Sequence, residues 1–370
     1  MATKRVSKKR AKQNSRCALC GKFVPPTDSA AIVGRTGKRI CSACTCVWQV
    51  PQPQNNTPDI FSHGSIITPS DMVTELNHYI IGQETAKHAV ALALWKQQLR
   101  AHGTALPKSG LLLYGPSGCG KTALVQQAAE LAGVPFLAFD STTLIENGYR
   151  GRDVEEVVQE LIHRFGEEQA QYGVVFLDEI DKLAAHRDDP AQASHYRAVQ
   201  HALLKLVEGT EIPATKNSFQ TFSTKNILFV FGGAFRNLSV EQSQRSIKVL
   251  GFGREDYISG SPSHEPLADA FIRYGMEPEL IGRIGRFIPL SPLTQEQLQE
   301  ILLHAKTSVY RQYQRFFQTY GIEAALTASE INALTEQALR QGLGARGLNT
   351  LVEEWIEPKL LELSIKTQTR

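Results

Sequence analysis

The sequence predicts an α/β protein built on a parallel sheet, followed by a smaller helical domain and preceded by a short cysteine-bearing module. Four apolar segments, bounded by Gly, Asp or Lys and separated by helical stretches, predict buried parallel strands. These segments are residues 111–114, 134–139, 174–177 and 227–231. After Pro292 the pattern is mainly helical, as at 295–305 and 327–339, and this predicts the smaller domain.

Length and composition indicate a globular protein of two or three domains. The 370 residues are 42% hydrophobic and 21% charged, which allows a sizeable core and excludes wholesale disorder. No apolar run of about 18 residues is present, and the start lacks the apolar stretch of a secretory signal. We therefore expect a soluble, cytoplasmic protein without a membrane partner.

Charge and proline content divide the chain further. Residues 1–16 hold seven Lys or Arg and no acid, which predicts a basic disordered tail in preference to a nucleic-acid-binding arm. Residues 49–67 hold three prolines among Gln and Asn and predict a linker. Thr68 and Asp71 are helix-capping residues that mark the next domain. We expect a zinc-binding module at 17–48, a large α/β domain at 68–290 and a small helical domain at 291–370.

A glycine-rich loop follows the first predicted strand and opens a helix at 123–132. Its residues GPSGCGKT fit the pattern G-x-x-x-x-G-K-[ST] of phosphate-binding loops. Glycines let backbone N–H groups surround the phosphates, Lys121 neutralises β- and γ-phosphate oxygens, and the Thr122 hydroxyl ligates Mg²⁺. Cys119 is interpreted as a small filler, with an oxidisable thiol as the alternative. The predicted ATP-binding residues of the loop are Gly115, Pro116, Ser117, Gly118, Cys119, Gly120, Lys121, Thr122 and Ala123.

An acidic motif supplies the second half of the nucleotide site. The apolar segment 174–177 ends in Asp178 and Glu179, and Asp178 lies 56 positions after Thr122 (178 − 122). Asp178 is placed near the Mg²⁺, and Glu179 is predicted to polarise the water that attacks the γ-phosphate. Together with the phosphate loop, this motif predicts a nucleoside triphosphatase.

Two cysteine pairs, Cys17 with Cys20 and Cys41 with Cys44, give the spacing C-x₂-C-x₂₀-C-x₂-C. Four thiolates at this spacing fit tetrahedral Zn²⁺ and leave no position for a catalytic water, so a structural site is predicted. A module of this size needs the metal to fold. Cys46 is interpreted as a small apolar residue rather than a ligand. A nucleic-acid-binding zinc ribbon is the rival interpretation, favoured only by the basic tail.

Several separated motifs resemble those of the ClpX family, AAA+ unfoldases that supply protein substrates to a barrel-shaped peptidase. The resemblance extends from the cysteine module to about residue 361. It implies the AAA+ fold for the α/β domain, which would be the large ATPase domain, and ATP, Mg²⁺ and Zn²⁺ as cofactors. The segments that carry it are YIIGQ at 79–83, GYRG at 148–151, HALLKLVEGT at 201–210, FGGAF at 231–235, MEPELIGR at 276–283 and GARGL at 344–348.

The resemblance implies roles in nucleotide turnover. Ile80 and Ile81 would pack on adenine, and Arg346 would sense the phosphates within its own subunit. Arg283 would reach the γ-phosphate of a neighbouring subunit as an arginine finger, with Arg286 as the alternative. Such fingers accelerate phosphoryl transfer by about 10³–10⁵. The end of the strand at 227–231 offers two glycines and no polar side chain, so no γ-phosphate sensor is assigned there.

The resemblance also implies partners. Tyr149, between glycines, would line the axial channel of a homo-hexamer and grip protein substrates. Leu250, Gly251 and Phe252 resemble a loop that docks on a ClpP-like peptidase. The cysteine module would bind adaptor proteins.

Some segments depart from the family pattern. Arg150 adds a charge beside the gripping tyrosine, and Arg197 stands in the second pore-facing segment. The segment 211–226 is short and lacks the Arg-Lys-His loop that captures substrate tags in the family. Fewer residues follow Arg346 than in the family pattern, which implies that the last part of the small domain is shortened.

These observations predict a ring ATPase that unfolds proteins and delivers them to a ClpP-type peptidase. A remodelling chaperone that works without a peptidase is the alternative. A zinc-ribbon regulator that binds nucleic acid under a nucleotide switch ranks third, and nucleic acid is not the expected partner.

Overall fold

The computed structural model describes residues 32–33, 39–40, 66–108, 110–145, 152–184, 190–215, 220–236, 238, 267–321 and 324–368. The chain divides into two units, one up to Thr57 and one from Pro58 onward. In the first unit, β1 (Ile32–Val33) pairs antiparallel with β2 (Arg39–Ile40), with Ile32 opposite Ile40. The predicted zinc ligands lie outside the described residues. They are Cys17, Cys20, Cys41 and Cys44.

The second unit is built on a five-stranded parallel sheet. The four predicted strands are confirmed as β3 (Leu111–Tyr114), β4 (Phe136–Asp140), β7 (Val174–Asp178) and β10 (Leu228–Gly233). A fifth, β11 (Phe287–Pro289), was not predicted because three residues ending in proline carry little strand signal. The order across the sheet is β11-β3-β10-β7-β4. β10 therefore lies between β3, which precedes the phosphate loop, and β7, which ends at Asp178 just before Glu179.

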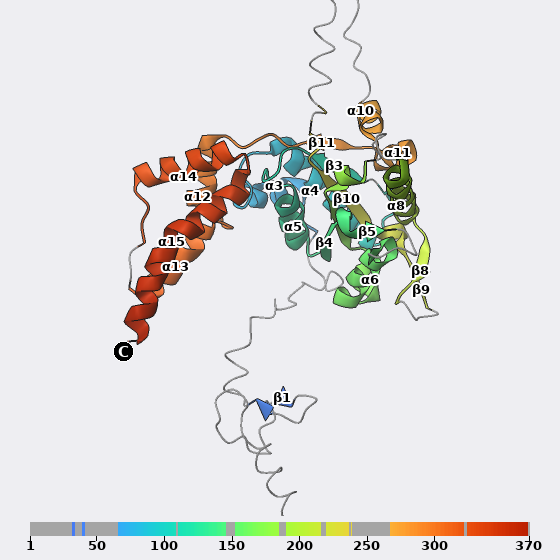
Figure 1. Cartoon of the computed structure of the whole chain (residues 1–370). Helices are drawn as coiled ribbons and strands as arrows, with labels where there is room; N and C mark the ends of the chain where they lie inside the picture. Colours follow the sequence, from blue (N-terminus) through green and yellow to red (C-terminus); the bar gives the residue numbers. More distant parts are fainter. Residues whose placement is uncertain are drawn as a thin grey trace, which may run out of the picture. The chain divides into compact units, whose positions relative to one another are not determined.

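Both faces of the sheet are buried because successive side chains alternate between two apolar cores. Leu112, Val175 and Phe229 belong to one core, whereas Leu113 and Phe176 belong to the other. Helices cover each face (Figure 1). One face carries α3 (Pro69–Leu76), α4 (Glu84–Ala101) and α5 (Lys121–Ala132). The other carries α6 (Val154–Phe165), α7 (Glu167–Ala170), α8 (Pro190–Glu208), α10 (Leu267–Tyr274) and α11 (Pro278–Ile284).

Short elements connect these layers. β5 (Leu144–Ile145) pairs parallel with β6 (Arg152–Asp153), and β8 (Glu211–Pro213) pairs antiparallel with β9 (Thr221–Ser223). Single turns of 3₁₀ helix lie at η1 (Ser141–Thr143), η2 (Ile180–Leu183) and η3 (Thr224–Asn226). The predicted pore residue Tyr149, between β5 and β6, lies outside the described residues, as do the predicted docking residues Leu250, Gly251 and Phe252.

A third core belongs to the C-terminal helices α12 (Gln295–His304), α13 (Val309–Thr319), α14 (Ala328–Gln341) and α15 (Gly344–Gln368). The predicted helical domain is thus confirmed. Thr294 and Thr327 start α12 and α14 with reciprocal capping hydrogen bonds, which satisfy amide groups that a helix start leaves free. Within the described ranges, every helix is too short or too polar to cross a membrane.

Candidate active site

The phosphate loop joins β3 to α5, and its shape depends on glycines. Gly115, Gly118 and Gly120 have φ values of 152°, 72° and 98°, which side chains disfavour. A Cβ atom on Gly115 would also lie 2.3 Å from the Leu290 carbonyl oxygen. The loop ends at Lys121, the first residue of α5, so the positive end of the helix dipole points toward the loop. This arrangement is a phosphate cradle.

Two side chains of the loop are held inside it. The Lys121 ammonium donates to the carbonyl oxygens of Gly115 and Pro116 at 2.8 and 2.9 Å. Cys119 is only 3% exposed, and burial raises the pKa of its thiol. Since oxidation proceeds through an accessible thiolate, the filler interpretation of Cys119 fits the structure and the oxidisable alternative does not.

The acids at the end of β7 meet the start of α5. The Thr122 hydroxyl donates to Asp178 Oδ2 at 2.8 Å, and the Glu179 backbone N–H donates to Asp178 Oδ1 at 2.9 Å. Glu179 itself has φ 56° and an exposed side chain, so its carboxylate stays available to solvent and substrate. The structure therefore brings together Thr122, Asp178 and Glu179, as their predicted roles require.

This donor set suits Mg²⁺. A hydroxyl and a carboxylate oxygen already lie within hydrogen-bond distance, and both are hard oxygen ligands. In the described part of the chain, no group of three His, Cys, Asp or Glu side chains is arranged to hold a metal. Thr122 and Asp178 would therefore hold Mg²⁺ only together with phosphate oxygens and water, as is usual for this ion.

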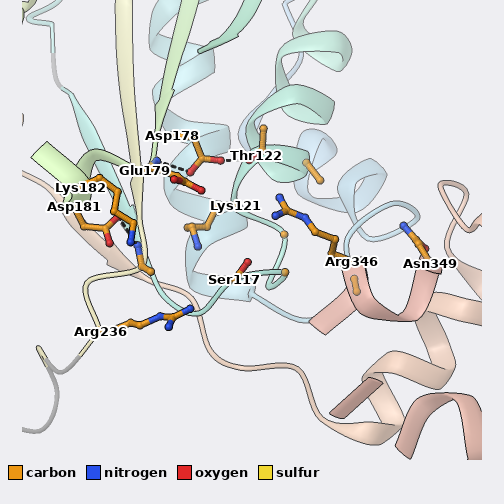
Figure 2. Close-up of a pocket in the computed structure, with 15 residues that line it drawn as sticks. Ser117, Lys121, Thr122, Asp178, Glu179, Asp181, Lys182, Arg236, Arg346 and Asn349 are labelled. Carbon is orange, nitrogen blue, oxygen red and sulfur yellow. Dashed lines mark hydrogen bonds between the residues drawn. The ribbon is translucent and has the colours of Figure 1, made fainter. Parts of the chain in front are cut away.

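These segments line one pocket of about 380 Å³ (Figure 2). Its wall includes residues from the phosphate loop, the end of β7, η2, the turn after β10 and the start of α15. Four cations and three acids face it, for a net charge of +1 (4 − 3) before a nucleotide is bound. They are Lys121, Lys182, Arg236 and Arg346, and Asp178, Glu179 and Asp181. A polyanion with its Mg²⁺ is the ligand class that this charge pattern fits.

Most of the predicted nucleotide residues line this pocket. They are Ser117, Gly118, Gly120, Lys121, Thr122, Ala123, Asp178, Glu179 and Arg346. Gly115, Pro116 and Cys119 shape the loop but are not among the lining residues. Ile80 is 8% exposed and packs in the core beside α4 and α5, and Ile81 is half-buried, so neither lines the pocket. Arg283 is exposed on α11 and also lies outside it.

The C-terminal helices reach the nucleotide pocket through α15. The Ala345 N–H donates to the Gly118 carbonyl at 3.1 Å, and a Cβ on Gly118 would lie 1.9 Å from the Leu343 carbonyl oxygen. Gln83 makes a second connection, because its amide exchanges two hydrogen bonds with the Ser291 backbone at 2.8 and 3.0 Å. The phosphate loop thus contacts both the large α/β part and the first turn of α15.

Sequence reasoning missed six pocket residues. Two are alanines, Ala234 and Ala345, and four have polar or charged side chains: Asp181, Lys182, Arg236 and Asn349. Asp181 and Lys182 stand just beyond the acidic pair, where a 3₁₀ turn directs them to the pocket. Arg236 follows the two glycines that end β10, and Asn349 lies one position beyond the GARGL motif. A glycine pair after a buried strand signals a close approach and could have pointed to its neighbours.

Comparisons with known proteins agree with this geometry. A family profile described as AAA domain (Cdc48 subfamily) matches residues 106–287, and one described as the C-terminal, D2-small domain, of ClpB protein matches residues 293–370. The chain is 34% identical over 377 residues to "ATP-dependent Clp protease ATP-binding subunit ClpX 2" of Wolinella succinogenes, covering 96% of this chain and 93% of that protein. The chain belongs to the ClpX family of AAA+ ATPases.

Two further ClpX relatives match over similar lengths. The ClpX proteins of Treponema denticola and Azotobacter vinelandii are each 33% identical, over 94% and 96% of this chain and 89% and 87% of their own. The ClpX resemblance drawn from the separated motifs, the AAA+ fold and the ATPase activity of this ClpX-family chain are therefore confirmed. ATP with Mg²⁺ is the substrate that its fold implies. The domain bounds and the roles of single residues stay predictions.

Proposed function

We propose that this ClpX-family ATPase is a protein unfoldase and translocase, which works as a homo-hexameric ring and delivers unfolded proteins to a ClpP-type peptidase. The relatives carry the name of Clp protease ATP-binding subunits, which supports a peptidase partner. The single observation that carries the proposal is the division of the basic residues between two places. Lys121 and Arg346 line the nucleotide pocket, whereas Arg283 is exposed outside it.

The residues of the pocket have separate tasks in this proposal. The Lys121 ammonium leaves the loop carbonyls and neutralises phosphate oxygens, and Thr122 with Asp178 holds Mg²⁺, which supplies charge neutralisation when bound. The exposed carboxylate of Glu179 accepts a proton from the attacking water. Arg346, at the start of α15, contacts the bound phosphates and couples their presence to the position of the small domain, which meets the loop through the hydrogen bond from Ala345 to Gly118.

Arg283 completes the site of a neighbouring subunit. It lies in the last turn of α11, which ends at Ile284 and is capped by Gly285, and its side chain is exposed. Arg286 is half-buried, and its backbone is tied to β3 because its carbonyl accepts the Leu112 N–H at 2.9 Å. An arginine supplied by the neighbour makes hydrolysis depend on assembly, as a ring motor requires.

The N-terminal module is proposed to bind one Zn²⁺ through Cys17, Cys20, Cys41 and Cys44, and to recruit adaptor proteins. The β1–β2 pair lies between the two cysteine pairs and ends directly before Cys41, as in a hairpin that joins two ligand pairs. The compartment proposed is the cytoplasm, where thiols stay reduced. One zinc per full-length chain, lost in Cys41→Ser, is the expected result of metal analysis.

Unfolding is tested with a stable fluorescent protein that carries an unstructured tail. With ATP, the full-length chain should abolish its fluorescence, and Tyr149→Ala should turn over ATP without unfolding. Tyr149→Phe is the matched control, because it keeps the aromatic ring that grips the chain. ATP turnover without loss of fluorescence by the unchanged protein would contradict the proposal.

Delivery is tested by adding a ClpP-type peptidase and measuring peptide release. Phe252→Ala should keep unfolding and lose degradation. Unfolding with no degradation by the unchanged protein would instead establish the remodelling chaperone, which the departures at Arg150 and 211–226 also favour.

A further inference from the structure

We propose that Arg236 binds the terminal phosphate of ATP within its own subunit, as a cation supplied by the turn after β10. The inference rests on the ATPase activity of the family and concerns a residue for which the sequence motifs assign no role. Four observations carry it: the packing at the end of β10, the anchored turn, the placement of the guanidinium and the side from which Arg236 approaches the pocket.

The end of β10 packs directly against Asp178 and Asp181 and leaves no room for a side chain. A Cβ on Gly232 would lie 2.9 Å from Asp178 Oδ1 and 2.5 Å from the Phe176 ring. A Cβ on Gly233 would lie 3.0 Å from Asp181 Oδ1. A polar residue on the strand itself could not be accommodated here. A side chain that reads the phosphates from this edge must therefore come from the turn that follows.

That turn is fixed at two points. The Ala234 N–H donates to Asp181 Oδ1 at 3.0 Å, which ties the turn to η2. Phe235 then has φ 42°, a conformation that is rare for an aromatic residue and persists only where the surroundings impose it. Its ring is 3% exposed and packs edge-on against Phe271 and Tyr274, with centroid distances of 4.8 and 5.1 Å. The buried ring directs the next residue back toward the nucleotide.

The Arg236 side chain extends from this turn toward the phosphate loop (Figure 2). In that view it lies on the opposite side of Lys121 from Arg346. It is exposed in the pocket, and it makes no hydrogen bond or ion pair with any residue that the structure describes. A guanidinium with five free donors beside a phosphate cradle is suited to bidentate binding of phosphate oxygens.

The position of Arg236 indicates which phosphate of ATP it would contact, namely the terminal one. The turn is tied to Asp181, and the end of β10 that precedes it packs against Asp178, so Arg236 approaches from the edge where Asp178 would hold Mg²⁺. Arg346 approaches from α15, where Gly118 meets the small domain. ATP and ADP differ in the terminal phosphate, which in this proposal would lie on the Arg236 side. Arg236 should therefore discriminate between the two nucleotides, whereas a residue with a structural task would not.

The test compares Kd for ATP and ADP by calorimetry, with Mg²⁺, in a Glu179→Gln background that prevents hydrolysis. Arg236→Ala should raise the Kd for ATP by about tenfold to hundredfold, the usual range for a lost charge-assisted pair, and change the Kd for ADP less than about twofold. Arg236→Lys should recover part of the loss. Arg164→Ala, an exposed arginine of α6 paired with Glu160, is the control and should change neither. Equal weakening of both nucleotides, or of neither, would overturn the inference.

Mixed assemblies distinguish action within the subunit from action on a neighbour. Arg236→Ala and Lys121→Ala chains are mixed, and ATP turnover is compared with the sum of the separate preparations. If Arg236 acts in its own subunit, the mixture should not exceed that sum, because no subunit holds both residues. Recovery of turnover in the mixture would assign Arg236 to the neighbouring site and contradict the proposal.

Discussion

The Gly118→Ala substitution tests whether ATP turnover requires the contact between the phosphate loop and the first turn of α15. The pattern G-x-x-x-x-G-K-[ST] accepts any residue at this position, but the structure does not. The added Cβ would lie 1.9 Å from the Leu343 carbonyl oxygen, whereas real Cβ atoms keep at least 3.0 Å. Backbone rather than a flexible side chain would have to move, so the small domain must withdraw from the loop.

The free-energy cost of the Gly118→Ala substitution has two parts. Alanine at φ 72° costs about 1–2 kcal/mol relative to glycine. Withdrawal of α15 breaks the hydrogen bond from Ala345 to Gly118, which is worth about 1 kcal/mol. Because the backbone cost at Gly118 falls on the phosphate loop itself, the two losses together weigh about 2–3 kcal/mol against the closed arrangement, and we expect ATP turnover to fall by about 30-fold to 150-fold.

The assay is steady-state ATP turnover, with thermal unfolding measured in parallel. Gly342→Ala is the matched control: Gly342 has φ 66°, but a Cβ there meets nothing within 4 Å. It should lower the unfolding temperature through the same backbone cost and change turnover less than about threefold. If Gly118→Ala and Gly342→Ala reduce turnover alike, the steric contact between α15 and the loop is not required, and the reasoning fails.

Three further outcomes follow from individual side chains. Glu179→Gln should bind ATP with unchanged affinity and lose turnover; normal hydrolysis by this variant would remove Glu179 from its assigned role. Gln200 is fully buried, and its amide donates to the Leu183 carbonyl at 2.7 Å and accepts from the Glu277 N–H at 2.8 Å. Gln200→Leu should therefore lower the free energy of unfolding in urea by about 2 kcal/mol. An unchanged free energy would mean that water satisfies both backbone groups. Burial, with help from nearby arginines, lowers the pKa of Lys108 from 10.5 to about 7. Between these values the unfolded chain binds more protons than the folded one, so the free energy of unfolding should rise with pH over about 7–10.5, and less steeply in Lys108→Met; parallel curves for the two proteins would refute the assignment.

The parts of the site that were predictable are those encoded by local pattern. The phosphate loop needs glycines, Lys and Thr at fixed spacing, and the acids follow a run of apolar residues, so Lys121, Asp178 and Glu179 could be identified directly. The four longer strands were predictable because both faces of a parallel sheet are buried and their residues are apolar throughout. β11 was missed because its three residues carry no such run.

The rest depends on which strands are neighbours. Arg236 reaches the pocket only because β10 lies between β3 and β7, and the apolar patterns of the strands do not specify that order. Asp181 contributes through the turn of η2 and its hydrogen bond to Ala234, neither of which has a sequence signal of its own. Arg346 was indicated by family resemblance alone. Its place in the pocket comes from packing between α15 and the phosphate loop.

The dependence of ATP turnover on protein concentration tests the central claim, that active sites are completed by a neighbouring subunit. Turnover per subunit should rise steeply with the concentration of full-length, zinc-loaded protein. Arg283→Ala should abolish that rise, and Arg286→Ala should retain it. A rate that stays flat with concentration and is indifferent to Arg283 would contradict the ring ATPase.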